Sequence, residues 1–344
     1  MVKKKVYTLG IETSCDETSA SVVDNEYNII SNIVFSQQKL HSSYFGVVPE
    51  LASRTHYEKI HFVIDKALKN FDIKKIDLIA YTEKPGLKGA LLIGKTVAKT
   101  LGYIYSIATI GIDHLWGHIY SVLLTYKGEI KFPFLSLIIS GGHTELSMVY
   151  SFSERKILGE TRDDAVGEAF DKTAKMLVEY IQKVKKSYTK NLKFLNQCLK
   201  QLKYPGGPVI EKFAKYGNPY SINFPKPYML ENYDFSFSGL KTAVLYYLNS
   251  KIKDFYPKLI FDVCASFQET VVDTIITKIL HTTKKLNCKI VCISGGVSAN
   301  NYLKKKMLDL EKKHNIKVYF PEINLSTDNA AMIASAGGHF YFNS

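Results

Sequence analysis

The sequence of 344 residues is poor in several features that mark particular classes of protein. Its five cysteines are odd in number and form no CxxC pair, which argues against a disulfide framework and against a cysteine-ligated metal site. No apolar run approaches the roughly 18 residues that a membrane-spanning helix needs. The lysine-rich start meets acidic residues before any stretch that resembles a signal peptide. We therefore expect a cytoplasmic protein with no membrane partner.

Arginine is also scarce, since the chain has only Arg54, Arg155 and Arg162. Lysine supplies nearly all of the basic charge, and the formal net charge is +13. A surplus of this size is typical of proteins that bind an anionic partner such as nucleic acid. A codon-driven bias towards lysine produces the same number, so the charge alone leaves both interpretations open.

What the chain does contain is enough apolar sequence for a large core. Apolar residues make up 46% and charged residues 22%, which excludes disordered and collagen-like chains. At roughly 150 residues per domain, the length allows about two domains or one fold built twice. A strand–turn–strand pattern at residues 6–24 recurs at 134–149, and helical and strand-like segments alternate after each copy. We predict an α/β fold of two lobes, residues 1–127 and 128–344, with ligands bound where strand ends face one another.

One segment interrupts this alternation. Residues 176–203 hold seven lysines against the single acid Glu179, with apolar side chains interleaved. That pattern predicts a basic amphipathic helix or a helical hairpin. Its charged face is either simply solvated or a landing surface for phosphates.

The most specific chemical motif is the pair His114 and His118, whose spacing puts both imidazoles on one face of a helix, where they can hold a metal ion. Zinc peptidases of the HExxH type share this spacing but need a glutamate after the first histidine, and here that residue is Leu115. Asp328 is the candidate third ligand, unless it only caps the final helix expected at 326–341. Two histidines and one carboxylate leave coordination positions open and suit Fe²⁺ or Zn²⁺.

Two glycine-rich turns follow strands, one at residues 140–144 (SGGHT) and one at 294–300 (SGGVSAN). Glycine lets the main chain approach a phosphate closely, and the second turn leads into a helix N-terminus, which favours negative charge. Neither turn is a Walker A loop. Together they favour a nucleotide site, and ordinary tight turns are the alternative, as they are for the YPGGP turn at 204–208.

The turn at residues 12–19 places three carboxylates beside hydroxyl groups directly after the first strand. Acids at a strand end can orient an amine nucleophile or accept its proton, which makes Asp16 and Glu17 candidates for catalysis. Solvated turn chemistry is the alternative. Cys15 is not a candidate nucleophile, because the neighbouring acids raise the pKa of its thiol.

Nine motifs in one order make the chain resemble a known family. In chain order they are GIETSCDET, VVPELASR, HLWGH, SGGHT, GEAFDKTAK, YPGGP, DFSFSGLKT, GGVSAN and STDNAAMIA. They are similar to those of the bacterial TsaD family, the tRNA adenosine threonylcarbamoyltransferases once catalogued as O-sialoglycoprotein endopeptidases. The resemblance implies a duplicated actin-like, Hsp70-like ATPase fold. It also implies transfer of a threonylcarbamoyl group from threonylcarbamoyl-AMP to N6 of the adenosine 3′ of the anticodon, in tRNAs that read codons beginning with A.

The resemblance further assigns residues and partners. His114, His118 and Asp328 would hold a divalent metal, with iron expected ahead of zinc. The residues expected to bind the acyl-adenylate are Ile138, Ile139, Ser140, Gly141, Gly142, Asp171, Gly207, Glu211 and Asn300. The expected partners are tRNA, TsaB-like and TsaE-like helper proteins, and a TsaC-type enzyme that supplies threonylcarbamoyl-AMP. Residues 176–203 depart from the family's spacing and are expected to be an insertion.

Two other functions fit parts of the pattern. A metallopeptidase of glycoproteins is what the family's older name suggests, although the missing HExxH glutamate counts against it. A non-catalytic regulator would use the same fold to bind a nucleotide and shift a partner-binding state.

Overall fold

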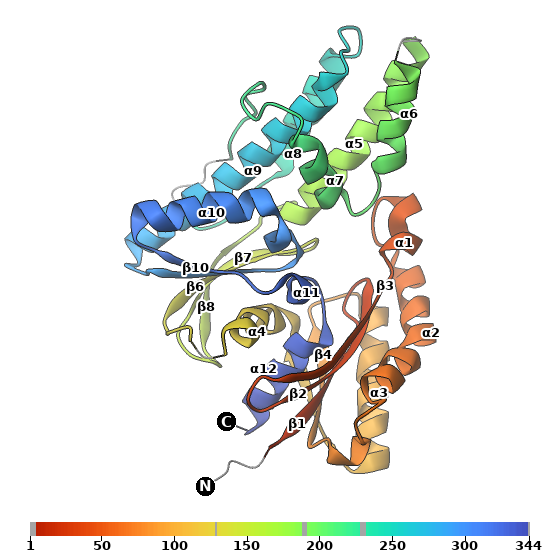
Figure 1. Cartoon of the computed structure of the whole chain (residues 1–344), viewed down its shortest axis with the longest axis vertical. Helices are drawn as coiled ribbons and strands as arrows, with labels where there is room; N and C mark the ends of the chain where they lie inside the picture. The colour runs from red at the N-terminus through yellow and green to blue at the C-terminus, as the bar shows by residue number, and fades with distance from the viewer. Residues whose placement is uncertain (1–4, 128, 188–190, 228–231, 343–344) are drawn as a thin grey trace.

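The computed structural model of the chain describes residues 5–127, 129–187, 191–227 and 232–342. Within these residues the strands form two five-stranded sheets (Figure 1). The first has the order β3-β2-β1-β4-β5 and consists of β1 (Tyr7–Glu12), β2 (Glu17–Asp24), β3 (Ile29–Ser36), β4 (Leu78–Lys84) and β5 (Ala108–Asp113). The second has the order β10-β9-β6-β7-β8 and consists of β6 (Phe134–Ile139), β7 (Thr144–Val149), β8 (Arg155–Glu160), β9 (Ile290–Ser294) and β10 (Lys317–Tyr319).

The two sheets have the same topology. In the first, β1 pairs antiparallel with β2 and parallel with β4. In the second, β6 pairs antiparallel with β7 and parallel with β9. One further antiparallel strand and one further parallel strand complete each sheet. The predicted α/β fold built twice is therefore confirmed, whereas the division of the chain at residues 127 and 128 stays a prediction.

The helices fall into two groups along the chain. Those before the second sheet are α1 (Gln38–His41), α2 (Pro49–Ala67), α3 (Lys88–Tyr105) and α4 (His114–Tyr126), with 3₁₀ turns η1 (Ser42–Tyr44) and η2 (Ile73–Lys75). Those after β8 are α5 (Val166–Ser187), α6 (Leu192–Gln201), α7 (Gly206–Ala214), α8 (Ser238–Ser250), α9 (Lys258–Lys285), η3 (Gly296–Ala299), α10 (Asn301–His314), α11 (Ile323–Ser326) and α12 (Ala330–Phe342). No helix in the described ranges is both long and apolar enough to cross a membrane.

Strand β1 is covered on both faces, which explains its nearly continuous apolar sequence. Leu9 and Ile11 pack among residues of α2 and α3. Side chains alternate along a strand, so Gly10 faces the other way, towards α12. A Cβ atom at Gly10 would come within 2.2 Å of the carbonyl oxygen of Ala330, so only glycine allows this approach.

Helix α12 therefore packs on the first sheet, although it follows the second sheet in the chain. It contacts β1, β2, β4 and α4, and Figure 1 shows it beside the strands at the opposite end of the colour scale. A hydrogen bond ties its first residue to β2, because the main-chain N–H of Ala330 donates to Oγ of Ser19 at 2.9 Å. This packing brings the residues just before α12 to the end of β1.

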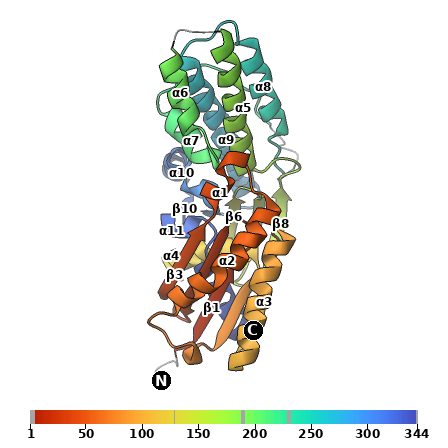
Figure 2. The ribbon, with the colours of Figure 1, turned by 90° about the vertical axis from the view of Figure 1, so that its right-hand side faces the viewer.

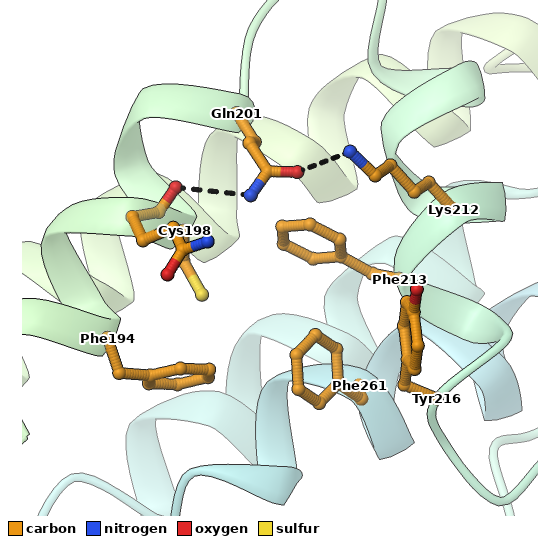
Figure 3. Close-up of a pocket in the computed structure, with 8 residues that line it drawn as sticks. Phe194, Cys198, Gln201, Lys212, Phe213, Tyr216 and Phe261 are labelled. Atoms are coloured by element: carbon orange, nitrogen blue, oxygen red, sulfur yellow. Dashed lines mark hydrogen bonds between the residues drawn. The ribbon is translucent and has the colours of Figure 1, made fainter.

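The lysine-rich segment 176–203 forms the end of α5 and all of α6, which lie side by side in Figure 2. The predicted amphipathic helical pair is confirmed, since Val184 and Leu195 are buried while Lys186 and Lys193 are exposed. Residues 188–190 lie outside the described residues. A pocket of about 330 Å³ opens between α6, α7 and α9 (Figure 3), and it is lined by Phe194, Gln197, Cys198, Gln201, Lys212, Phe213, Tyr216 and Phe261.

Candidate functional site

The two histidines lie in the first two turns of α4. Asp113 caps this helix, because its side chain accepts hydrogen bonds from the main-chain N–H groups of Leu115 and Trp116 at 3.0 and 3.3 Å. The helix therefore begins at His114, and His118 follows one turn later. Both side chains are buried, and their ring centroids are 4.7 Å apart. The predicted placement of the pair on one helix face is confirmed.

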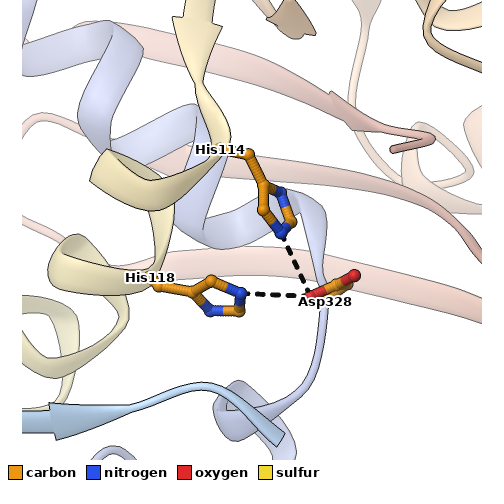
Figure 4. Close-up of side chains that lie close together, drawn as sticks. All are labelled: His114, His118 and Asp328. Carbon is orange, nitrogen blue, oxygen red and sulfur yellow. Dashed lines mark ion pairs between the residues drawn. The ribbon is translucent and has the colours of Figure 1, made fainter. Parts of the chain in front are cut away.

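Asp328 completes this cluster from the other end of the described chain. Its Oδ1 atom lies 3.2 Å from Nε2 of His118 and 3.5 Å from Nε2 of His114, and Figure 4 shows both rings turned towards it. Ligand atoms of the three residues lie within 4.8 Å of one another. The Asp328 side chain is 15% exposed, so one side of the cluster is open.

Asp328 is not the cap of the final helix, so that alternative interpretation is wrong. The helix begins at Ala330. The side chain of Asn329 caps it by accepting a hydrogen bond from the N–H of Met332 at 3.1 Å. The carboxylate of Asp328 is therefore available to the two histidines.

A glycine between the histidines allows α4 and α12 to pack closely. A Cβ atom at Gly117 would lie 2.8 Å from Cδ1 of Ile333 and 3.1 Å from Cγ of Met332. Contacts this short require the neighbouring side chains to move. The small residue at this position thus helps to hold the histidines of α4 near Asp328.

The charges of the cluster reinforce one another. Burial disfavours a charged imidazole, but the carboxylates of Asp328 and Glu12 outweigh it and raise the pKa of His114 well above its ordinary value. Burial likewise opposes ionisation of Asp328, yet the two histidines hold its pKa well below the ordinary range. Neither ring nitrogen of His118 makes a hydrogen bond within the described part of the chain. Buried imidazole nitrogens without such partners, beside a carboxylate, fit a divalent cation.

Two further residues near the cluster belong to the quoted motifs but are not among the predicted metal-site residues. Glu12 is fully buried, and its Oε2 atom lies 3.2 Å from Nδ1 of His114. His143 of the SGGHT turn has its ring centroid 6.2 Å from that of His114. Burial and the neighbouring histidines lower the pKa of His143 to about 4, so it is neutral at pH 7. The only sequence signals are the position of Glu12 at a strand end and that of His143 in a glycine-rich turn.

Asp16 lies in the turn that follows β1, Glu17 is the first residue of β2, and both are buried. The hydroxyl of Tyr204 donates to Oδ2 of Asp16 at 3.3 Å, and that of Ser36 donates to Oε1 of Glu17 at 3.3 Å. Burial raises the pKa of both carboxyls, and the negative charge of Asp328 raises each further. The turn therefore lies within electrostatic reach of the histidine–aspartate cluster.

The predicted acyl-adenylate residues of the second sheet gather where β6 ends. Ile138 and Ile139 end this buried strand, and the N–H of Gly167, at the start of α5, donates to the carbonyl oxygen of Ser140 at 3.1 Å. Cβ atoms at Gly141 and Gly142 would meet nothing within 4 Å. The main chain of this turn therefore borders open space, as a phosphate-binding turn requires.

Asp171 and Gly207 meet where α5 contacts α7. Oδ1 of Asp171 accepts a hydrogen bond from the N–H of Gly206 at 2.6 Å. Burial raises the pKa of Asp171 to about 7 in spite of this bond, and the charge of Asp16 adds to the effect. A Cβ atom at Gly207 would meet nothing within 4 Å, so this main chain also borders open space.

The side chains of Asn300 and Glu211 are engaged within the protein. Asn300 caps α10 by accepting from the N–H of Leu303 at 2.9 Å, and its amide donates to Gln268 at 3.0 Å. Oε1 of Glu211 accepts from the main-chain and side-chain nitrogens of Asn301, both at 3.0 Å. A ligand-binding role for these two side chains stays a prediction.

Comparison with known proteins connects these features. Residues 28–335 match the family model described as TsaD, tRNA N6-adenosine threonylcarbamoyltransferase. Proteins of that name are 48% identical in Endomicrobium trichonymphae, over 95% of this chain and 90% of that protein, and 44% identical in Clostridioides difficile (strain 630), over 98% and 94%.

Solved structures of HypF share the fold at low sequence identity. The T. kodakarensis protein superposes with a TM-score of 0.58 at 16% identity, over 98% of this chain and 48% of that chain. Full-length HypF in its phosphate- and nucleotide-bound form gives a TM-score of 0.55 at 12% identity, over 98% and 56%. This chain thus corresponds to about half of each HypF chain.

Proposed function

The chain belongs to the TsaD family of tRNA N6-adenosine threonylcarbamoyltransferases, and from that membership we propose how its own residues carry the reaction. The protein is a transferase that acts on tRNA and forms threonylcarbamoyladenosine. The observation that carries this function is the 48% identity over 95% of the chain to a protein of that name. The buried cluster of two histidines and one aspartate supports a divalent metal in the site.

We propose that the donor is threonylcarbamoyl-AMP and that it lies between the end of β6 and the starts of α5 and α7. The open main chain at Gly141, Gly142 and Gly207 supports contacts with its phosphate and ribose. Asp171, beside Gly207, is placed to accept a hydrogen bond from a ribose hydroxyl. The donor is a mixed anhydride and is already activated, so the protein needs to position it and stabilise charge rather than supply a covalent nucleophile.

We propose that His114, His118 and Asp328 hold the metal, with iron ahead of zinc. Two histidines and one carboxylate with open positions are typical of Fe²⁺ sites. When bound, the ion supplies Lewis-acid chemistry towards an oxygen of the donor. The open side of the cluster at Asp328 supports access for such an oxygen.

The acceptor amine is a poor nucleophile, because the lone pair of N6 is delocalised into the adenine ring. We propose that Asp16 or Glu17 takes its proton as the new bond forms. Burial raises the pKa of both carboxyls, which makes them stronger bases when ionised. The target base must be unstacked from the anticodon loop to arrive, as in other enzymes that act on bases.

We propose that the exposed lysines of the segment 176–203 bind the phosphates of the tRNA. The segment projects as part of a helical layer above the second sheet (Figures 1 and 2), and the aromatic pocket of Figure 3 lies on the same layer. A surface that combines lysines with aromatic rings suits an RNA backbone and unstacked bases.

We also propose protein partners. We propose TsaB-like and TsaE-like helpers, with a TsaC-type enzyme as the source of the donor, and we place the reaction in the cytoplasm with its tRNA. Exposed apolar side chains on α2 and α3, among them Tyr57, Leu92 and Tyr103, support a protein contact on that face. Neither a peptidase nor a regulator is favoured by an observation, since Leu115 occupies the position of the peptidase glutamate.

Reconstitution tests the function. The purified protein is combined with threonine, bicarbonate, ATP, an acyl-adenylate-forming enzyme, the helper proteins and a tRNA that reads codons beginning with A. Mass analysis of the nucleosides should then detect threonylcarbamoyladenosine. A tRNA with guanosine in place of the target adenosine is the control. Absence of the product in the complete mixture would overturn the proposal.

A further inference from the structure

We propose that Glu12 is a positioning residue that orients His114 for metal binding. The inference rests on the metal site of the proposed function. Glu12 ends β1, a few residues before the acidic pair Asp16 and Glu17, and its carboxylate faces His114 of α4. It acts through His114 rather than on the substrate.

The fold places Glu12 beside His114 through the register of the first sheet. Strand β1 pairs in parallel with β4, and Ile11 is opposite Tyr81. The next residues of the two strands, Glu12 and Thr82, therefore lie side by side. Because side chains alternate, Glu12 projects to the same face as Gly10, where α12 packs against the sheet and against α4.

The carboxylate of Glu12 is fixed by donors on both of its oxygen atoms. Oε1 accepts from the N–H of Ser14 at 2.5 Å, and Oε2 accepts from the hydroxyl of Thr82 at 2.5 Å. Its side chain is fully buried, so solvent does not compete for these positions. Oε2 lies 3.2 Å from Nδ1 of His114, which makes the imidazole its third partner.

This arrangement selects one tautomer of the imidazole. A carboxylate only accepts hydrogen bonds, so Nδ1 of His114 must carry the hydrogen that faces Glu12. When the ring is neutral, the lone pair is then on Nε2, the atom that lies 3.5 Å from Oδ1 of Asp328. A hydrogen bond to the other ring nitrogen is the usual way in which proteins orient a metal-binding histidine.

A comparison with Ser14 and His118 shows that the tautomer-selecting contact is specific to Glu12. The hydroxyl of Ser14 lies 3.3 Å from the same Nδ1 atom, but a hydroxyl can donate or accept and does not select a tautomer. His118 has no partner at Nδ1 within the described residues. Among the described residues the cluster therefore contains one histidine whose Nδ1 faces a carboxylate and one whose Nδ1 has no hydrogen-bond partner.

Replacement of Glu12 by glutamine tests the role with little change of shape. An amide cannot accept on both sides, as the carboxylate does. If its nitrogen faces His114, Nδ1 must become an acceptor and the hydrogen moves to Nε2, where it blocks the metal. If its oxygen faces His114, the amide nitrogen faces the N–H of Ser14, and two donors then meet without an acceptor.

Metal affinity of the full-length protein is the first readout. Zn²⁺ and Co²⁺ binding are measured by competition with a chromophoric chelator for wild type, Glu12→Gln and the matched control Ser14→Ala. We expect roughly 10–100-fold weaker binding for Glu12→Gln, and a change of less than about threefold for Ser14→Ala. Binding by folded Glu12→Gln that matches wild type within this margin would overturn the inference. So would a larger effect of Ser14→Ala than of Glu12→Gln.

A second readout separates orientation from a merely structural role. Nitrogen NMR of the Zn²⁺-loaded wild type should show His114 with its hydrogen on Nδ1 and its metal bond at Nε2, and the opposite assignment refutes the idea. Thermal unfolding of the metal-free proteins checks the fold. If Glu12→Gln does not fold, Thr82→Val removes one donor to the carboxylate while Glu12 itself is unchanged, and it should also weaken metal binding.

The role of Glu12 and the proposed transferase function can be told apart by experiment. A wild-type protein that forms product, while Glu12→Gln binds metal normally, removes only the role of Glu12. A wild-type protein that binds metal but forms no product in the reconstituted mixture removes the proposed function and leaves the role of Glu12 intact.

Discussion

Nε2 of His118 lies 3.2 Å from Oδ1 of Asp328, although one residue belongs to a helix of the first half of the chain and the other precedes the last described helix. The two residues meet because α12 packs against both β1 and α4. Asn329, the next residue, has a different task, since it caps α12. These two neighbouring residues thus have different roles: Asp328 belongs to the histidine cluster and Asn329 caps the helix.

These different roles predict different effects for substitutions at Asp328 and at Asn329. Asp328→Asn should reduce metal binding and product formation by more than about 100-fold, because removal of a ligand costs more than removal of an outer partner. Asn329→Ala should lower the free energy of unfolding by about 1 kcal/mol because the cap is removed, with little effect on metal content. Metal analysis of the purified variants and chemical denaturation check both. An equal decrease in metal content in the two variants would contradict the assignment.

Metal binding should release a proton at neutral pH. In the metal-free protein the carboxylates raise the pKa of His114 well above its ordinary value, so the ring is charged at pH 7. A metal ion must displace that proton, and affinity should rise about tenfold for each pH unit below the pKa of His114. Calorimetry in two buffers with different ionisation enthalpies measures the released proton. Binding heats that do not depend on the buffer would refute this expectation.

Asp171 should make the ligand-free protein less stable as the pH rises. Its pKa is about 7 in the folded protein and about 4 when unfolded, so the folded state binds more protons between these values. Its contribution to the free energy of unfolding therefore falls as the pH rises from about 4 to 7. Asp171→Asn should remove this slope and raise the Tm at pH 8 by a few degrees, while it weakens binding of the acyl-adenylate. Thermal scans from pH 5 to 8 test the slope, and an unchanged profile contradicts it.

The lysine-rich segment should contribute to tRNA affinity in a salt-dependent way. The test changes four exposed lysines to glutamine: Lys183, Lys186, Lys193 and Lys200. We expect weaker binding of tRNA, and a slope of log K against log salt that falls by roughly 0.7–0.9 for each phosphate that the variant no longer neutralises. A control with the same change of charge elsewhere is the fourfold glutamine variant of Lys66, Lys69, Lys74 and Lys75. Equal effects of the two sets would reduce the segment to a solvated helical face.

The periodicity of apolar residues is enough to predict the strands and helices whose burial pattern is regular. The strand–turn–strand segment expected at 134–149 matches the outer ends of β6 and β7, and the one expected at 6–24 matches those of β1 and β2 to within one residue, because apolar runs bounded by polar turns leave little choice of limits. The sequence pattern does not reveal β8, an edge strand with several exposed side chains, or α8. It also misses α7, because its first residues Gly206 and Gly207 are typical of a turn.

Some residues of the site can likewise be predicted from the sequence and others cannot. The histidine pair follows from helical spacing alone, so it is predictable. Whether Asp328 caps a helix or joins the histidines depends on where α12 begins, and the expected start at 326 is too early because Asn329 takes the cap. The contact of Glu12 with His114 depends on the register of β1 against β4 and on the packing of α4 across them, which no local pattern contains.

The return of α12 to the first sheet has a consequence for synthesis of the protein. A chain made from its N-terminus can form the strands of the first sheet early. The face of β1 that carries Gly10 stays uncovered until α12 has been made. Contacts between segments so far apart in sequence close slowly. Throughout that interval the histidines of α4 have no aspartate beside them. The metal centre is thus among the last parts of the molecule to assemble, and a chain interrupted before Asp328 carries the strands of both sheets without it.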